Sequence, residues 1–226
     1  MTIRINGGTI ANVFGGGSTS NSGGATYADD VTITVSGGTI TGAIYARGQL
    51  ATDHVTGSAT VTFTGAENFN CGVYGYSYVG STENDATLTF NGYTGTFSGS
   101  IGGFSGIAFN DGAQATFADT AGISNGAWEF DLSARDAELA GTSLLTWSGA
   151  DFAGDTVKVA FADATQAAAG WSIAAADFTG ATFDLWINGS EIAEGIAYDT
   201  AVGGTGDWAD WKFTSVDGTL KFAQIA

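Results

Sequence analysis

A few ionisable residues have the types that acid–base chemistry requires. Asp29-Asp30, Arg47 and Asp53-His54 fall in stretches without a strand pattern, so we expect them in loops. A pair of carboxylates can cleave a glycosidic bond when both flank it. Adjacent residues of a strand point to opposite faces, so a working pair needs carboxylates two residues apart or on neighbouring turns of the chain. Polysaccharide cleavage is therefore one hypothesis for these residues.

The other reactive side chains define no site. His54 is the single histidine, so a histidine metal cluster has no ligands and a serine triad has one candidate base. Neither the serine-nucleophile signatures nor the phosphate-binding glycine pattern occurs. Cys71 is the single cysteine, and we expect a small buried residue rather than a catalytic thiol. The sequence thus predicts no catalytic residue, no metal site and no cofactor.

Charge limits the classes of partner. The net charge is −17, from 23 acidic and 6 basic residues. Such a surface repels phosphate backbones and anionic lipid headgroups, which disfavours nucleic acids and membrane surfaces as partners. No run of residues reaches the length of an apolar membrane helix. We therefore expect contact with a membrane only through a separate anchor or translocator outside this chain.

Two groups of aromatic residues could stack on sugar rings if they are exposed. Tyr74, Tyr76 and Tyr78 have the period of two that places them on one face of a strand. Trp208 and Trp211 are three residues apart near the end of the chain. Large aromatic residues more often supply core area, so burial is the alternative interpretation, and the stronger one for the tryptophans.

The elements that position these residues are internal repeats. The first apolar residue steps from Ile3 to Ile33, Val61 and Leu88, at spacings of 30, 28 and 27 residues. A weaker fifth copy is expected at Thr116-Phe117. A period of this length is typical of stacked repeat architectures. The copies are Thr2–Ile10, Thr32–Ile40, Thr60–Gly65 and Thr87–Gly92.

Each copy alternates apolar and hydroxyl residues with the period of a strand. A Gly-Gly pair then allows a bend before a second strand such as Thr39–Thr41, and a third is expected at Ala43–Tyr45. This content predicts an all-β fold, a right-handed parallel β-helix (solenoid) with about 27–30 residues per coil. Its inward columns are Ile3/Ile33/Val61/Leu88 and Ile5/Val35/Phe63/Phe90, and its loops are 15–30, 47–58 and 76–85.

The outward face of the same strands carries hydroxyl groups. Threonines would stack in two columns, about 7 Å apart along a strand and about 4.8 Å between coils. Such an array resembles the device of ice-binding solenoids. The alternative is an ordinary exposed strand face, where threonine is favoured, and Arg4 and Ala118 interrupt the array. The residues of the two columns are Thr32, Thr34, Thr60, Thr62, Thr87 and Thr89.

The second half of the chain differs in composition and contains all six tryptophans. We expect repeats over 1–120 and continuing β-structure with a β-rich C-terminal cap over 121–226. Alternating strands are predicted at 128–132, 155–161 and 182–187, and a short helix within 162–176. Asp217-Gly218 predicts the turn of a closing hairpin.

The repeats resemble the glycine-rich passenger regions of bacterial surface and autotransporter-type adhesins. Gly7–Ile10 and Gly37–Tyr45 carry this resemblance, and Phe213–Phe222 is similar to the hairpins that cap such passengers. It covers about half of the chain. It implies a right-handed β-helix related to the pectate-lyase-like fold, in which carbohydrate-cleaving sites also occur.

These observations favour a non-enzymatic structural or adhesin-type solenoid that is secreted or displayed on a bacterial cell surface. Its expected partner is a host or cell-surface glycan or protein. A carbohydrate-active β-helix protein, binding or cleaving polysaccharide, is the first alternative. An ice-binding solenoid that uses the threonine columns is the second.

Overall fold

The computed structural model describes residues 1–16, 26–27, 29–49, 54–76, 86–118, 121–124, 126–149 and 151–225. The fold is all-β, with parallel sheets stacked as a β-solenoid, as the repeats predict. Helical structure among the described residues is confined to η1 (Ala137–Leu139) and α1 (Ala164–Ala168). Two compact units make up the chain, Met1–Ile107 with Thr120–Asn125 and Ala108–Asp119 with Gly126–Ala226.

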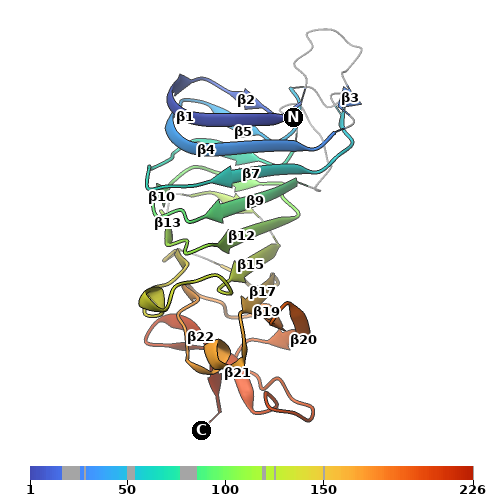
Figure 1. Ribbon diagram of the computed structural model, residues 1–226, viewed down its shortest axis with the longest axis vertical. Helices are drawn as coiled ribbons and strands as arrows, with labels where there is room; N and C mark the ends of the chain where they lie inside the picture. The colour runs from blue at the N-terminus through green and yellow to red at the C-terminus, as the bar shows by residue number, and fades with distance from the viewer. Residues whose placement is uncertain are drawn as a thin grey trace. The chain divides into compact units, whose positions relative to one another are not determined.

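In the first unit, β1 (Thr2–Ile10), β4 (Val31–Ile40), β7 (Ala59–Phe63) and β9 (Ala86–Asn91) lie side by side in sequence order and run parallel (Figure 1). Their register is the predicted one. The first inward column is Ile3/Ile33/Val61/Leu88 and the second is Ile5/Val35/Phe63/Phe90. From β4 to β9 all of these column residues are fully buried, so the alternation of apolar residues within each copy determines the core.

The Gly-Gly pairs do not separate two strands. β1 and β4 each continue through their pair, and their register shifts on both sides of Asn6. Gly8 and Gly38 have φ values of 81° and 97°, which glycine adopts without steric cost. The expected separate strand at Thr39–Thr41 is therefore wrong, because a β-bulge absorbs the bend within one long strand.

A second parallel sheet of the first unit consists of short strands, as predicted at Ala43–Tyr45. Its order is β14-β11-β8-β5-β2, and the inward residues Ile44, Val73 and Ile101 stack on one another. A further pair, β3–β6, lies within two stretches that the sequence assigns to loops. The bounds are β2 (Val13–Phe14), β5 (Ala43–Tyr45), β8 (Gly72–Tyr74), β11 (Ile101–Gly102), β14 (Ile123–Ser124), β3 (Thr26–Tyr27) and β6 (His54–Val55). β10 (Thr96–Phe97) belongs to another sheet.

The fifth copy of the repeat was expected in the wrong place. Thr116 lies in β13 (Ala115–Phe117), which pairs with β16 (Leu145–Thr146) in a different sheet. Instead Ser105, directly before β12 (Gly106–Asn110), donates a backbone hydrogen bond of 2.8 Å to the carbonyl of Ala86 in β9. The segment beginning at Gly106 lacks the Thr-x-Thr pattern. The sequence pattern therefore did not identify it as the fifth copy.

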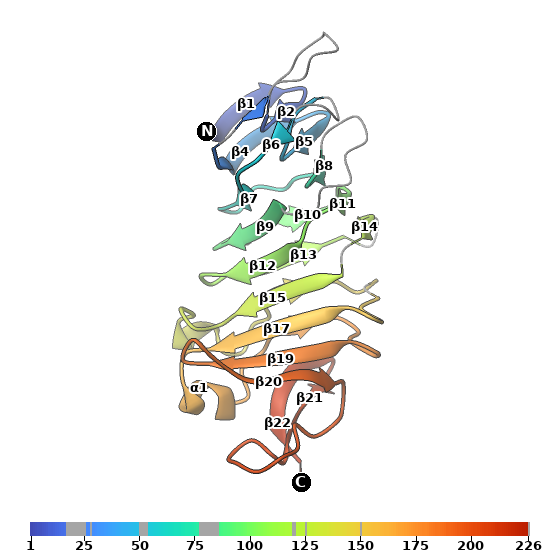
Figure 2. The same cartoon turned by 90° about the vertical axis from the view of Figure 1, so that its right-hand side faces the viewer.

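In the second unit the predicted strands form and remain parallel. Figure 2 shows β15 (Ala127–Asp131), β17 (Thr156–Phe161) and β19 (Thr182–Ile187) side by side, with β20 (Ser190–Ala197) antiparallel beyond β19. α1 forms within the Ala-rich stretch. In another sheet, β18 (Ala174–Ala175) lies between β16 and the closing hairpin of β21 (Trp211–Val216) and β22 (Thr219–Gln224). Asp217 and Gly218 have φ values of 53° and 73°, as the predicted tight turn requires.

Candidate functional site

The threonine columns form as predicted on the outward face of β4, β7 and β9. Thr32, Thr60 and Thr87 occupy matching positions, and so do the three threonines two residues later. The hydroxyl oxygens of Thr60 and Thr87 are 3.2 Å apart and share a hydrogen bond. Thr87 is exposed, and the other five column residues are half-buried. The result is an uncharged surface of hydroxyl and methyl groups.

This surface changes character at β1. Thr2 continues the first column, whereas Arg4 stands beside Thr34 in the second. The bulge then brings the Ser36 hydroxyl within 2.9 Å of the Asn6 side-chain oxygen. Arg4 therefore ends the second column, as the sequence indicated.

The tyrosines belong to a ladder of stacked rings in the second sheet. Phe14, Tyr45 and Tyr74 follow one another at matching positions, with ring centroids 5.5 Å and 5.3 Å apart. The ring of Tyr76 stacks on Tyr74 at 5.2 Å. It lies against Gly103, where a β-carbon would come within 2.3 Å of the Tyr76 ring. Tyr76 thus fills the space that a glycine leaves on the next turn.

This arrangement corrects the interpretation of the tyrosines as one strand face. β8 ends at Tyr74, so Tyr76 lies beyond the strand, and Tyr78 lies outside the described residues. Tyr74 has a stacked ring on each side, at Tyr45 and Tyr76, so its faces are used within the ladder. Burial and the nearby Tyr74 raise the pKa of Tyr76. The ladder therefore contributes to the packing between turns, and sugar binding by the half-buried Tyr74 and Tyr76 stays a prediction.

The two tryptophans of the last segment lie in an aromatic cluster of the cap. Trp208 and Trp211 meet edge to face at 5.1 Å, and both contact Phe222, at 5.6 Å and 5.2 Å. Both indoles are half-buried, so each retains some exposed surface. Beside them the Gln224 side-chain amide donates to Asp210 at 2.7 Å. A partly exposed aromatic surface next to carboxylates is suited to contacts with a sugar or peptide.

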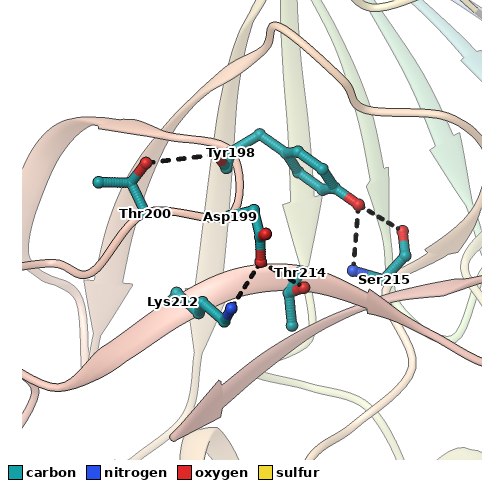
Figure 3. Close-up of polar contacts among 6 residues, drawn as sticks. All are labelled: Tyr198, Asp199, Thr200, Lys212, Thr214 and Ser215. Carbon is teal, nitrogen blue, oxygen red and sulfur yellow. Dashed lines mark hydrogen bonds and ion pairs between the residues drawn. The ribbon is translucent and has the colours of Figure 1, made fainter. Parts of the chain in front are cut away.

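A polar cluster fixes the segment that carries Trp208 (Figure 3). The Asp199 carboxylate accepts hydrogen bonds from Lys212 at 2.6 Å and from the Thr214 hydroxyl at 2.8 Å. The Tyr198 hydroxyl donates to the Ser215 hydroxyl at 2.9 Å and accepts from its backbone N–H at 3.2 Å. These bonds hold the connection between β20 and β21 against β21. Lys212, followed by Thr214, lowers the pKa of Asp199.

Two of the acid–base candidates, Asp30 and Arg47, have structural contacts. The Asp30 carboxylate accepts from the Ser58 backbone N–H at 2.8 Å, which joins two turns of the chain, and Asp29 is exposed. Arg47 is fully buried and donates to the Val55 carbonyl at 2.6 Å. Asp53 lies outside the described residues.

His54 contributes its backbone to β6. Among the described residues no three histidine, cysteine or acidic side chains are grouped to hold a metal ion.

Sequence reasoning missed the buried Arg135. Its guanidinium donates to the carbonyls of Ala113 at 3.1 Å and Leu139 at 3.1 Å and to the Thr142 hydroxyl at 2.7 Å. Desolvation lowers its pKa. It lines a groove together with Thr165 and Gln166 of α1. Its hydrogen bonds indicate a structural role for this cation. Apart from its rarity in so acidic a chain, no pattern in the sequence marks Arg135.

Comparison with known protein families, with characterised proteins and with solved structures finds no match for this chain. No helix in the described part of the chain has the length and apolar character of a membrane span.

Proposed function

We propose that this chain is a non-enzymatic structural and adhesive solenoid, secreted or displayed on a bacterial surface. The observation that carries the proposal is the uncharged threonine surface of β4, β7 and β9, held in strict register over a fully buried core. In a stacked fold of this kind each turn contacts its neighbouring turns. The strands themselves therefore hold the threonine surface in place, and no loop is needed to position it. Its expected partner is a glycan or protein of a cell surface.

The chemistry of this surface supports such a partner. Threonine hydroxyls both donate and accept hydrogen bonds, and their methyl groups provide apolar contact. Sugar hydroxyls and peptide groups need the same combination. The net charge of −17 adds repulsion toward anionic surfaces, so binding would have to be specific and short-range.

Binding of the labelled chain to bacterial or host cells and to a glycan panel would test this function. Thr62→Lys places a charge at the centre of the threonine surface and should reduce binding at least tenfold. Ser190→Lys, at an exposed residue of the other unit, is the matched control and should bind normally. Equal binding by both variants, or none by the unchanged protein, would reject the adhesive role of this surface.

The same register favours ice binding as a second candidate. Threonine columns with regular spacing can order water in a lattice, and the columns here contain three matched pairs. Thermal hysteresis and inhibition of ice recrystallisation measure this activity directly. Both should be present in the unchanged protein and lost in Thr62→Lys. Their absence from the unchanged protein at high concentration would eliminate this candidate and leave the adhesive role to be judged by cell and glycan binding.

A further inference from the structure

A groove in the second unit lies between two segments that follow neighbouring strands of the long sheet. The first segment comes after β15 and contains η1, and the second comes after β17 and contains α1 (Figure 2). The groove has a volume of about 310 Å³, at the lower end of the range for small-molecule sites. Three alanines line it together with Ser133, Arg135, Asp163, Thr165, Gln166 and Trp171.

Hydrogen bonds join the two segments at two points. The buried Gln166 side chain accepts from the Ala162 N–H at 2.7 Å and donates to the Leu132 carbonyl at 2.8 Å. The backbone N–H of Ser172 donates to the Ala140 carbonyl at 3.1 Å. The fold therefore holds the walls of the groove in place before any ligand arrives, which lowers the entropic cost of binding.

Trp171 is the lining residue that most clearly indicates a ligand. Its indole is half-buried, and within the described residues it contacts neither another aromatic ring nor a cation. The other five tryptophans contact an aromatic ring or, at Trp186, the Lys158 ammonium group. The Trp171 indole N–H makes no hydrogen bond to any residue that the structure describes. This side chain thus offers a groove ligand both an apolar ring and a hydrogen-bond donor.

The polar groups of the groove have unused hydrogen-bonding capacity. The hydroxyls of Ser133 and Thr165 are exposed and have no partner among the described residues. The Nη1 atom of Arg135 carries two hydrogens and donates one hydrogen bond, to the Ala113 carbonyl at 3.1 Å. The Asp163 carboxylate uses one of its oxygens to cap α1. The groove consequently offers both donors and acceptors.

This lining is better suited to a neutral sugar than to other small molecules. No leucine, isoleucine, valine, phenylalanine or methionine is among the described residues of the groove, so a mainly apolar ligand would find little to pack against. Asp163 and the net charge of −17 oppose an anion, and Arg135 opposes a cation. A pyranose ring has hydroxyls that donate and accept, and a face of C–H groups that packs on an indole.

We propose that this groove binds one neutral pyranose unit of a glycan. The sugar ring lies on Trp171, and its hydroxyls exchange hydrogen bonds with Ser133, Asp163 and Thr165. The groove shares no residue with the threonine surface, so this inference is independent of the adhesive role proposed for that surface.

Titration of the ¹⁵N-labelled protein with the methyl glycosides of glucose, galactose, mannose and N-acetylglucosamine tests the proposal. The chain has six tryptophans, and the indole signal that is lost in Trp171→Ala is that of Trp171. At least one glycoside should shift this signal, with a dissociation constant on the order of 1 mM for so small a ligand. The other five indole signals should shift less.

Saturation transfer to the glycoside compares the variants without an indole signal. Trp171→Ala should bind at least tenfold more weakly. Thr165→Val keeps the shape of an exposed side chain, removes one hydroxyl, and should weaken binding severalfold. Trp186→Ala removes a half-buried indole of the same unit outside the groove, and it is the matched control that should bind normally. Thr62→Lys should also bind normally, which separates this site from the threonine surface.

Thermal unfolding of each variant, followed by circular dichroism, shows that it is folded at the temperature of the titration. An unshifted Trp171 signal with all four glycosides, or equal binding by Trp171→Ala and Trp186→Ala, would overturn the proposal. A response to methyl glucuronide without a response to any neutral glycoside would overturn the assignment of a neutral sugar.

Discussion

Gly99 passes so close to Cys71 that a β-carbon on Gly99 would lie 1.8 Å from the Cys71 carbonyl oxygen. The two residues belong to successive turns of the first unit, and Gly95 approaches the Glu67 carbonyl in the same way, at 2.2 Å. Neither glycine has a positive φ. Space between stacked turns, not backbone conformation, therefore requires glycine at these positions.

We predict that Gly99→Ala destabilises the protein by about 2 kcal/mol, because the new methyl group meets a fixed backbone atom and forces the two turns apart. Chemical denaturation followed by circular dichroism measures the change. Gly106→Ala is the matched control, since a β-carbon at Gly106 meets nothing within 4 Å and its φ is negative. A loss in Gly99→Ala no larger than in the control would contradict the steric explanation.

The hydrogen bond between Thr60 and Thr87 allows a second prediction. Replacing either residue with valine keeps the shape and the strand preference but removes one hydroxyl. A double-mutant cycle of Thr60→Val and Thr87→Val should give a coupling energy of about 0.5 kcal/mol, as expected for a cross-strand hydroxyl pair. Additive effects of the two substitutions would show that the pair contributes no stability of its own.

The core and register of this fold could be predicted because the same alternation of apolar residues recurs in the first four copies. Ile33, Val61 and Leu88 lie in one column as soon as the copies are aligned, and each is fully buried. The closing hairpin could be predicted from Asp217-Gly218 alone, because a tight hairpin turn requires positive φ values that these two residue types adopt readily.

Of the candidate site residues, the threonine columns could be predicted because they follow the same alternation. Thr34 and Thr62 stack because Val35 and Phe63 do. Tyr76 could not be placed, since its position depends on the missing side chain of Gly103 on the next turn. The contacts of Asp199 with Lys212 and Thr214 also depend on how the chain folds back, which no local pattern encodes.

The Asp199 contacts predict a pH-dependent contribution to stability. Lys212 and Thr214 lower the pKa of Asp199 in the folded state, so the stabilisation is present above the ordinary aspartate pKa. It is lost as pH falls through the folded-state value. Asp199→Asn should therefore be less stable than the unchanged protein at neutral pH, and the difference should shrink in acid.

Urea midpoints measured at several pH values would test this. Asp207→Asn, which removes an exposed carboxylate from the same connection, controls for the change in net charge. A difference between Asp199→Asn and the unchanged protein that stays constant with pH would argue against the ion pair as its source.

Asp155 should behave in the opposite sense. Desolvation raises its pKa, although its carboxylate accepts a hydrogen bond of 2.8 Å from the Trp128 indole. A raised folded-state pKa means that the ionised form opposes folding, and this cost appears as pH rises above the unfolded value. Asp155→Asn retains an acceptor for Trp128 without the charge. It should be at least as stable as the unchanged protein at neutral pH, with a smaller advantage at acidic pH.

Denaturation midpoints at neutral and acidic pH measure this difference, and Asp151→Asn is the control for loss of a neighbouring negative charge. If Asp155→Asn is the less stable protein at neutral pH, the charged hydrogen bond to Trp128 outweighs the cost of desolvation.

Cys71 provides a reporter for the opening of the first unit. Its side chain is 3% exposed, and burial raises the pKa of the thiol to about 11. At pH 8 only about one molecule in a thousand would carry the reactive thiolate, even where reagent could reach it. Labelling by a thiol reagent should therefore be slow in the native protein and should accelerate with urea. Ser190→Cys adds an exposed thiol to the same molecule and should react rapidly without denaturant. If Cys71 reacts as fast as this control in the native protein, its surroundings open far more often than a fully packed core allows.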